Sequence, residues 1–143
     1  MKIDTILATK GMNVVTIQPQ RSLKEAVRLL ERHNIGALVV VNESGMPIGI
    51  ISERDIVRQA VRDDIDLLNR PVSAVMTRNV VTGSPQDDLQ SVLRTMTEKH
   101  FRHLPIMDQG RLAGIISIGD VVKAQITEYQ GEIETLETRV VQG

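Results

Sequence analysis

The sequence predicts an α+β fold built from two copies of one unit, because one pattern of residues occurs twice along the chain. The Val-Thr, Pro-Gln and Leu of segment 15–23 recur in segment 81–89, a shift of 66 residues. The Gly-Ile-Ile-Ser and Asp of segment 49–55 recur in segment 114–120, a shift of 65 residues. A short repeated unit cannot bury its apolar face alone, so we expect the two copies to pack against each other.

The first half of each copy is predicted to be a short strand followed by an amphipathic helix. Segment 14–17 is a short β-rich run. Ser22, with a glutamate three residues later, forms a capping box that satisfies free N–H groups at a helix start. Apolar residues at helical spacing follow, and the helix should end near Asn34. The second copy repeats this pattern with a strand at 80–82 and an apolar helical stripe that begins at Leu89.

The second half of each copy is predicted to be a β-hairpin followed by another helix. In the first copy two apolar runs bracket a Glu-Ser-Gly turn at 43–45, and the second copy has the same arrangement. In chain order, the predicted elements are strands at 37–41 and 48–51, a helix over 52–62, strands at 104–107 and 112–116, and a helix that begins at Ser117.

The boundaries of the units follow from the repeat. The first copy with the N-terminal segment is placed at 1–66, the second copy at 67–124, and a helical extension at 125–143. The connector at 63–70 is polar enough to lie on the surface. Its apolar residues are expected to pack against the body of the protein; they are Ile65, Leu67 and Leu68.

Composition excludes several classes of function. The chain has 143 residues, which suit one compact body, and its 17 basic and 18 acidic residues create no field that attracts nucleic acid or an anionic membrane. Phe101 and Tyr129 are the sole aromatic residues, so a stacking platform for single-stranded nucleic acid is missing. There is no cysteine and no long apolar N-terminal stretch. We therefore expect a soluble, cytoplasmic protein without a nucleic-acid or membrane partner.

The paired Gly-Ile-Ile-Ser-x-x-Asp endings identify a family resemblance. Both lie at predicted strand-to-helix junctions, and they occur together with Val-Met-Thr at 75–77 and Arg-His-Leu-Pro at 102–105. From about residue 2 to residue 123 the chain resembles a pair of cystathionine β-synthase (CBS) domains, also called a Bateman module. The resemblance implies tandem β-α-β-β-α repeats packed as a pseudo-two-fold pair. It also implies a regulatory role, in which the pair acts on a protein that the sequence does not identify.

A serine that closes a strand, with an aspartate three residues later, can hold a nucleotide. The free N–H groups and the positive dipole end of a helix N-terminus favour phosphate, and the serine hydroxyl adds a donor. The aspartate oxygens suit the vicinal hydroxyls of a ribose. Ser52 with Asp55, and Ser117 with Asp120, are two such pairs. The alternative is that each pair only caps a helix, which contributes about 1 kcal/mol.

In CBS pairs the two sites are crossed, so that the aspartate of one repeat faces the first and second strands of the other. By this resemblance Asp55 and Asp120 lie in different pockets. The Asp55 pocket is expected to contain Ser52, Arg54, Thr77, Val81, Arg102 and His103. The Asp120 pocket is expected to contain Lys10, Val15, Gly36, Ala37 and Ser117.

The two pockets should differ in charge. The first junction reads Ser-Glu-Arg-Asp and the second reads Ser-Ile-Gly-Asp, so the first alone carries a guanidinium, that of Arg54, able to fork onto phosphate. The crossing adds Arg102 to the same pocket. We therefore expect the Asp55 pocket to favour the more highly phosphorylated ligands, the alternative being that both arginines are solvated surface residues.

We expect no enzyme activity and no metal site. The motifs of the nucleophile elbow, the dinucleotide fingerprint and the phosphate loop do not occur in the sequence. His100 and His103 are three residues apart at a predicted strand entry, which would point their rings to opposite faces, and no cysteine or nearby acidic ligand accompanies them. His103 is instead expected to contact phosphate or to make the pocket sensitive to pH.

The predicted function is the regulatory sensing of adenine nucleotides. AMP, ADP and ATP are the leading ligands, and NAD(H) follows closely because its two riboses could use both aspartates. A ligand-free interaction module, in which the junctions merely cap helices, is the alternative from a different class of protein.

The C-terminal extension carries an apolar stripe with coiled-coil spacing, and we expect it to take part in a homodimer. The stripe consists of Val122, Ile126, Tyr129, Ile133, Leu136 and Val140. Its β-branched residues favour a parallel pair, whereas Glu132 would then face Glu137 of the other chain. An antiparallel pair, with Glu132 near Arg139, and packing across the partner's body therefore stay open. So does a helix that folds back on its own domain.

Overall fold

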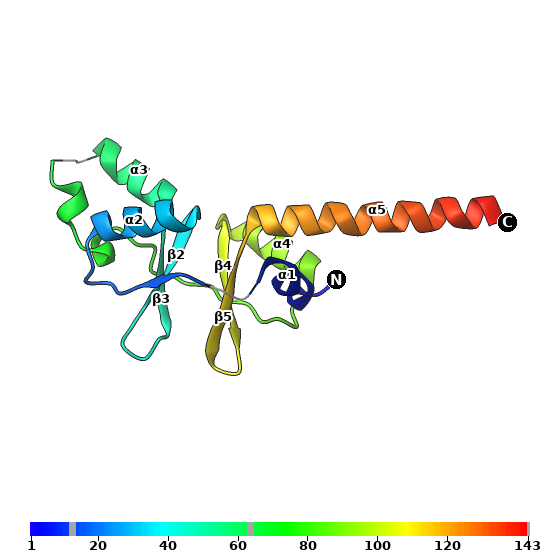
Figure 1. The fold of residues 1–143 in the computed structure, drawn as a ribbon, viewed down its shortest axis with the longest axis horizontal. Coiled ribbons are helices and arrows are strands. Elements are labelled where there is room, and N and C mark those ends of the chain that lie inside the picture. The colour runs from blue at the N-terminus through cyan, green and yellow to red at the C-terminus, as the bar shows by residue number, and fades with distance from the viewer. Residues whose placement is uncertain (12–13, 63–64, 143) are drawn as a thin grey trace.

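The computed structural model describes residues 1–11, 14–62 and 65–142, and each repeat forms its own small sheet (Figure 1). In the first repeat β2 (Ala37–Val41) is the central strand, with β1 (Thr16–Ile17) parallel to it and β3 (Pro47–Ser52) antiparallel. Helix α2 (Leu23–His33) buries its apolar stripe against these strands. Helix α3 (Glu53–Arg62) follows β3 directly.

The second repeat follows the same plan. Helix α4 (Leu89–Lys99) precedes the antiparallel strands β4 (His103–Asp108) and β5 (Arg111–Ser117), and helix α5 (Ile118–Gln142) follows. The backbone repeats in detail as well as in outline. The first N–H of α3, that of Glu53, donates to a carbonyl before β2, and the first N–H of α5 donates to the corresponding carbonyl before β4. The α+β class and the paired repeats are therefore confirmed.

The strand predicted at 80–82 is wrong. Among the described residues, the pairing here is reduced to a single parallel bridge between Gly83 and Ile106. Gly83 donates to the carbonyl of Pro105 at 2.9 Å and accepts from the N–H of Met107 at 2.8 Å. The backbone of Gly83 lies very close to β4, since a Cβ added to Gly83 would lie 2.8 Å from a methyl of Leu104. The β-rich composition of 80–82 therefore did not decide where the chain pairs.

Local signals in the sequence do set the helix ends. The N–H of Glu25 donates to Oγ of Ser22 at 3.2 Å, which confirms the capping serine of α2. Asn34 ends α2 in the left-handed conformation at φ 52°, where asparagine is tolerated. His100 ends α4 in the same way at φ 58°.

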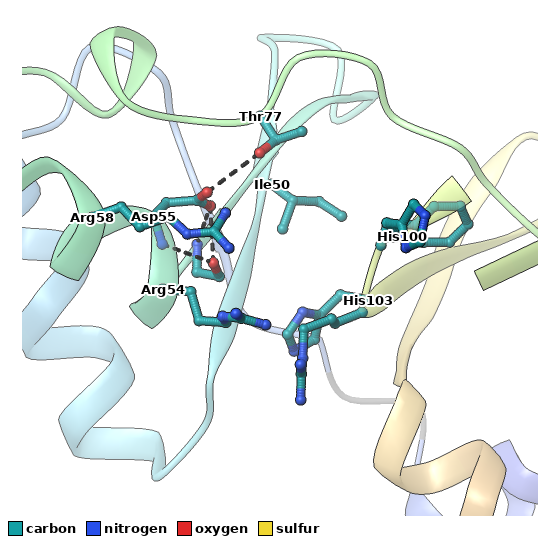
Figure 2. Close-up of a pocket in the computed structure, with 10 residues that line it drawn as sticks. Ile50, Arg54, Asp55, Arg58, Thr77, His100 and His103 are labelled. Carbon is teal, nitrogen blue, oxygen red and sulfur yellow. Dashed lines mark hydrogen bonds between the residues drawn. The ribbon is translucent and has the colours of Figure 1, made fainter. Parts of the chain in front are cut away.

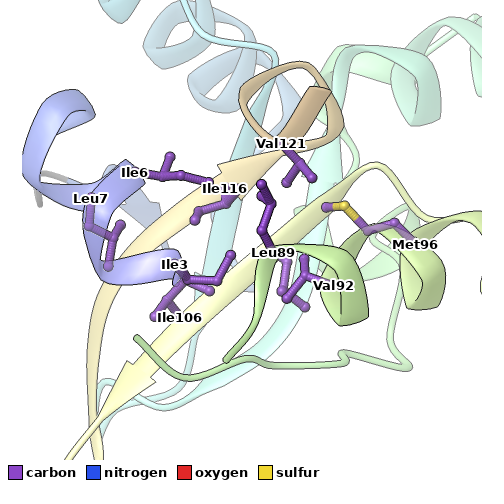
Figure 3. Packing of buried hydrophobic residues seen from close by; sticks show 10 residues of the cluster. Ile3, Ile6, Leu7, Leu89, Val92, Met96, Ile106, Ile116 and Val121 are labelled. Carbon is purple, nitrogen blue, oxygen red and sulfur yellow. The ribbon is translucent and has the colours of Figure 1, made fainter. Parts of the chain in front are cut away.

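Each repeat has a separate aliphatic core, and each core borrows residues from the segment that precedes the other repeat. The N-terminal helix α1 (Ile3–Lys10) packs Ile3, Ile6 and Leu7 against α4, β4 and β5 of the second repeat (Figure 3). Conversely, the segment that precedes the second repeat contributes Leu67, Val72 and Met76 to the core of the first repeat. The exchange joins the two repeats into one body.

The prediction that the apolar residues of the connector pack against the body is confirmed in part. Leu67 is buried, whereas Ile65 and Leu68 are exposed. Asp63 and Asp64, at the start of the connector, lie outside the described residues.

The predicted C-terminal helix is confirmed as a continuation of the second repeat's last helix. Helix α5 runs without a break for 25 residues and extends beyond the body of the protein (Figure 1). It does not fold back, because the apolar stripe from Val122 to Val140 is 41–80% exposed. Over the described residues, no helix is long and apolar enough to span a membrane.

Candidate functional site

The first junction joins β3 to α3, and its serine and aspartate cap the helix start for each other. The N–H and Oγ of Ser52 both donate to Oδ2 of Asp55, at 2.9 Å each, and the N–H of Asp55 donates to Oγ of Ser52 at 3.2 Å. Oδ1 of Asp55 receives a long hydrogen bond of 3.5 Å from Oγ1 of Thr77 (Figure 2). Capping therefore occupies one carboxylate oxygen and leaves the other weakly engaged.

The second junction joins β5 to α5 and has the same reciprocal cap. The N–H of Ser117 donates to Oδ2 of Asp120 at 2.9 Å, and the N–H of Asp120 donates to Oγ of Ser117 at 3.1 Å. At this junction the ammonium of Lys10 contacts the aspartate, whereas at the first junction the hydroxyl of Thr77 does. Nζ of Lys10 forms a salt bridge of 2.5 Å with Oδ2 of Asp120 and donates to the carbonyl of Ile115 at 2.9 Å.

The environment of Asp120 favours its charged form. Burial by itself raises the pKa of Asp120, but the hydrogen bonds from Lys10 and Ser117 and the positive charge of Lys10 lower it overall. Asp120 is therefore an ionised carboxylate that already has a cationic partner, whereas Asp55 faces a hydroxyl.

A pocket opens at the first junction between the two repeats. One wall comes from β3 and the start of α3, and the other from segment 100–103 at the entry to β4 (Figure 2). Most of its ionisable side chains are cationic or can become so. They are Arg54, Asp55, Arg58, His100, Arg102 and His103.

The three guanidiniums of this pocket are not neutralised. The side chains of Arg54, Arg58 and Arg102 form no hydrogen bond or ion pair with another described residue. Arg54 and Arg58 are four residues apart on α3 and so lie on the same side of that helix. Because one carboxylate faces three guanidiniums, the pocket suits a ligand that carries several negative charges.

A second cleft continues from this pocket toward the other junction. It is lined by Gly36 and Ser117 together with residues that also line the first pocket, namely Ser52, Arg54, Arg102 and His103. The repeats are in close contact here, since a Cβ on Gly36 would lie 3.9 Å from Nε2 of His103. The groove therefore runs from Asp55 at the first junction to Ser117 at the second, whereas Asp120 and Lys10 line a separate pocket between α1 and α5.

His103 lies between the two junctions. Burial lowers its pKa most, the charges of Lys10 and Arg102 lower it further, and Asp120 and Asp55 partly oppose them. Both aspartates thus act on this one imidazole. An anion bound beside it would stabilise the protonated form.

Comparison with known proteins assigns this architecture to a family. Residues 5–62 and 72–127 each match the CBS domain. The chain belongs to the CBS domain family. A CBS domain-containing protein of Bacillus subtilis, YhcV, is 34% identical over 125 residues, which make up 87% of this chain and 88% of the relative. The protein is therefore a CBS pair, a regulatory module.

Solved structures agree with this CBS fold. The CBS-domain containing protein ATU1752 from Agrobacterium tumefaciens is 42% identical, with a TM-score of 0.83 over 87% of this chain and 99% of that one. The CBS domain pair of protein MJ0100 is 26% identical, with a TM-score of 0.77 over 90% of this chain and 98% of that one. That structure holds 5′-methylthioadenosine and S-adenosyl-L-methionine.

The structure of this CBS pair brings together most of the residues expected at the crossed sites. Among those expected around Asp55, Ser52, Arg54, Thr77, Arg102 and His103 line the first pocket. Val81 does not, because it packs beside the core of the second repeat.

Of the residues expected around Asp120, Lys10 contacts it directly, and Gly36 and Ser117 line the second cleft. Val15 and Ala37 are not brought to it. Val15 packs beside the core of the first repeat, and Ala37 is buried within β2.

The sequence analysis did not identify Ile50, Arg58 or Phe101 as residues of the first pocket, and it misjudged His100. The spacing of Arg58 from Arg54, one helical turn, could have revealed Arg58. His100 was expected at a strand entry facing away from His103, but it caps α4 and lines the same pocket as His103. In a strand, residues three apart point to opposite faces, but His100 is in the left-handed conformation at the end of α4 and not in a strand, so this rule does not apply to it. Over the described residues, no cluster of three or more potential metal ligands is found.

Proposed function

We propose that this CBS pair binds adenine nucleotides, namely AMP, ADP or ATP, in the groove between its repeats and acts in the cytoplasm as a regulatory module. The observation that carries the proposal is the free side of Asp55. Its Oδ2 completes the helix cap, while Oδ1 has one long contact to Thr77 and faces a pocket with three guanidiniums. A ribose hydroxyl can bond to this oxygen while phosphates meet the guanidiniums.

The reported ligands of MJ0100 support an adenosine-containing ligand, because both compounds named in that structure carry an adenosine group. Occupancy would be passed on by a population shift. A ligand that binds one arrangement of the two repeats more tightly than another favours that arrangement, and a regulated protein or the protein's own homodimer would detect the change.

NAD(H) is the second candidate, since the groove extends from Asp55 at the first junction to Ser117 at the second. Four residues line both parts of this groove, and Ser52 and Ser117 stand at its two helix starts. A dinucleotide could place one ribose at Asp55, and its second ribose would reach Asp120 once the salt bridge between Lys10 and Asp120 opens. A ligand-free interaction module is the remaining alternative, and it predicts that no nucleotide stabilises the protein.

Thermal unfolding of protein freed of ligand, with AMP, ATP or NAD(H) at millimolar concentration, tests the proposal. A ligand present at 100 times its dissociation constant stabilises the fold by about 2.7 kcal/mol, which raises the melting temperature measurably. We expect D55N and D120N each to weaken binding, since asparagine keeps an oxygen for the cap but loses the charge. D108N, which changes an exposed aspartate at the end of β4, is the matched control. Unchanged melting with all three nucleotides would contradict the proposal.

A further inference from the structure

Helix α5 carries an apolar stripe that its own chain leaves uncovered. The stripe residues, defined above from Val122 to Val140, alternate in spacings of four and three and are all exposed. The helix touches its own body through a different face. Val121 is fully buried, Gln125 donates to Gln90 at 3.3 Å, and Glu128 forms an ion pair of 3.5 Å with the N-terminal ammonium of Met1.

We propose that the stripe is covered by the same stripe of a second copy of this chain, with the two α5 helices antiparallel and their two-fold axis at Gly131. This register leaves no stripe residue without an apolar partner. Ile126 meets Leu136, Tyr129 meets Ile133, and Val122 meets Val140 of the other copy. Each pairing joins an a position to a d position, as antiparallel packing requires. The proposal specifies the homodimer included in the proposed function, but it does not depend on nucleotide binding.

The charges beside the stripe select the antiparallel orientation. In the proposed register Lys123 of each copy lies opposite Glu137 of the other, which gives two attractive pairs. Gln125 lies opposite Arg139, and Gln130 and Glu132 each meet their own counterpart across the axis, so Glu132 makes the one repulsive pair. In a parallel pair, Glu132 and Glu137 face each other twice and no attractive pair offsets them. Electrostatic complementarity of this kind sets orientation more than it adds affinity.

The shape of the monomer is compatible with this pairing. The stripe spans 18 residues, or about 27 Å at 1.5 Å per residue, so the two bodies lie at opposite ends of the helix pair. Gly131 is on the outer side of the pair, and a Cβ placed there would meet nothing within 4 Å. The C-terminal part of α5 extends past the body of the protein (Figure 1).

Single cysteines test the orientation cleanly, because the chain has no cysteine of its own. E132C places the two thiols opposite each other at the proposed axis, whereas V122C places them about 27 Å apart. In a parallel pair V122C would bring the thiols together. We expect a short bis-maleimide cross-linker to join E132C into a covalent dimer and to leave V122C unlinked. Linkage of V122C, or failure of E132C to link, would overturn the proposal.

Charge reversal gives an independent measurement on surface positions that do not affect folding of the core. K123E and E137K should each raise the dimer dissociation constant measured by sedimentation, about tenfold in low salt, and the double variant should restore it. A parallel pair makes the opposite prediction for E137K, because this change relieves the repulsion with Glu132. Tighter dimers of E137K, or a monomeric wild type, would contradict the antiparallel pair. Nucleotide-induced melting shifts should be unaffected by E137K, which separates this test from that of the proposed function; K123E is not used for this comparison because Lys123 lines the same pocket as Asp120.

Discussion

At the scale of single residues, the two junction aspartates perform two tasks with two oxygens. Oδ2 of each closes the cap at a helix start, which is the ordinary structural role of such a residue. The two aspartates differ in the residue that contacts each of them; in both cases this residue comes from the segment that precedes the other repeat. Thr77 leaves Asp55 available to a ligand, whereas Lys10 engages Asp120 in a salt bridge. A ligand at Asp120 must therefore compete with Lys10 or share it.

Arg54 should discriminate between nucleotides by their phosphate number. Charge-assisted hydrogen bonds contribute about 1.5–3 kcal/mol each, so R54A should weaken ATP binding by about tenfold or more. Adenosine, which lacks phosphate, should lose far less. Calorimetry with both ligands measures the difference, and R62A, at the end of the same helix and outside the pocket, is the control. Equal losses for ATP and adenosine would place the Arg54 guanidinium away from the phosphates.

His103 should make phosphate binding depend on pH. Burial and the charges of Lys10 and Arg102 lower the pKa of His103 in the free protein, so the imidazole is largely neutral at neutral pH. A bound phosphate raises that pKa, and binding therefore takes up a proton between the two values. In that window affinity should fall as pH rises, by at most about tenfold per pH unit because one proton is involved.

The variant H103Q isolates this effect from the titration of the nucleotide itself. We expect the difference in ATP affinity between wild type and H103Q to grow as pH is lowered from 8 to 6. Parallel pH profiles for the two proteins would show that His103 does not sense the phosphate.

At the scale of secondary-structure elements, each β-hairpin is covered at the same glycine by a segment from outside its repeat, an irregular segment in the first repeat and helix α1 in the second. A Cβ on Gly49 of β3 would lie 2.6 Å from Sδ of Met76 and 3.0 Å from the backbone oxygen of Thr77. A Cβ on Gly114 of β5 would lie 2.8 Å from a methyl of Leu7 in α1. Both glycines thus permit another segment of the chain to pass closely over the hairpin. A Cβ on Gly49 would clash with a backbone atom as well as a side chain, whereas a Cβ on Gly114 would clash with a side chain only.

Alanine substitutions should reveal this difference. G49A should destabilise the fold by about 1–3 kcal/mol, because the bridge between Ile50 and Thr77 must move away. G114A should cost less, since the end of the Leu7 side chain can rotate. Denaturant unfolding of both variants measures the costs, and a larger loss for G114A would contradict this account.

At the scale of the whole molecule, the exchange of segments between the cores makes the two repeats one cooperative unit. Helix α1 precedes the first repeat in the chain, yet its apolar side is part of the second repeat's core (Figure 3). The arrangement also positions the second site, because Lys10 at the end of α1 reaches Asp120. Displacement of α1 would therefore also remove Lys10 from Asp120.

Truncation of Ile3, which is fully buried, should destabilise the entire protein and not merely detach a terminus. I3A should lower the free energy of unfolding by about 2–5 kcal/mol, as deletion of a buried aliphatic side chain does. I65A, at a position that is 94% exposed, should leave stability nearly unchanged. An I3A protein as stable as the wild type would mean that α1 is not integral to the core.

Local properties of the sequence predict the repeat, the order of helices and strands after residue 14 except for the strand at 80–82, the two ends of α2, and the two Ser-x-x-Asp junctions. These are local properties: the caps at Ser22 and Asn34, and the apolar periodicities, act within a few residues of each other. The resemblance to CBS pairs then supplied the crossing that brings Thr77 to Asp55 and Lys10 to Asp120.

Contacts between segments far apart in the chain set the remaining features, which are visible in the folded structure and not in the sequence. No local pattern shows that α1 belongs to the second repeat's core, that Gly83 and not segment 80–82 pairs with β4, or that Val81 turns away from the pocket. His100 and His103 share a pocket wall because a left-handed residue redirects the chain at the end of α4. In each case burial of apolar surface and steric fit between distant segments outweigh local preference, and these are properties of the folded whole.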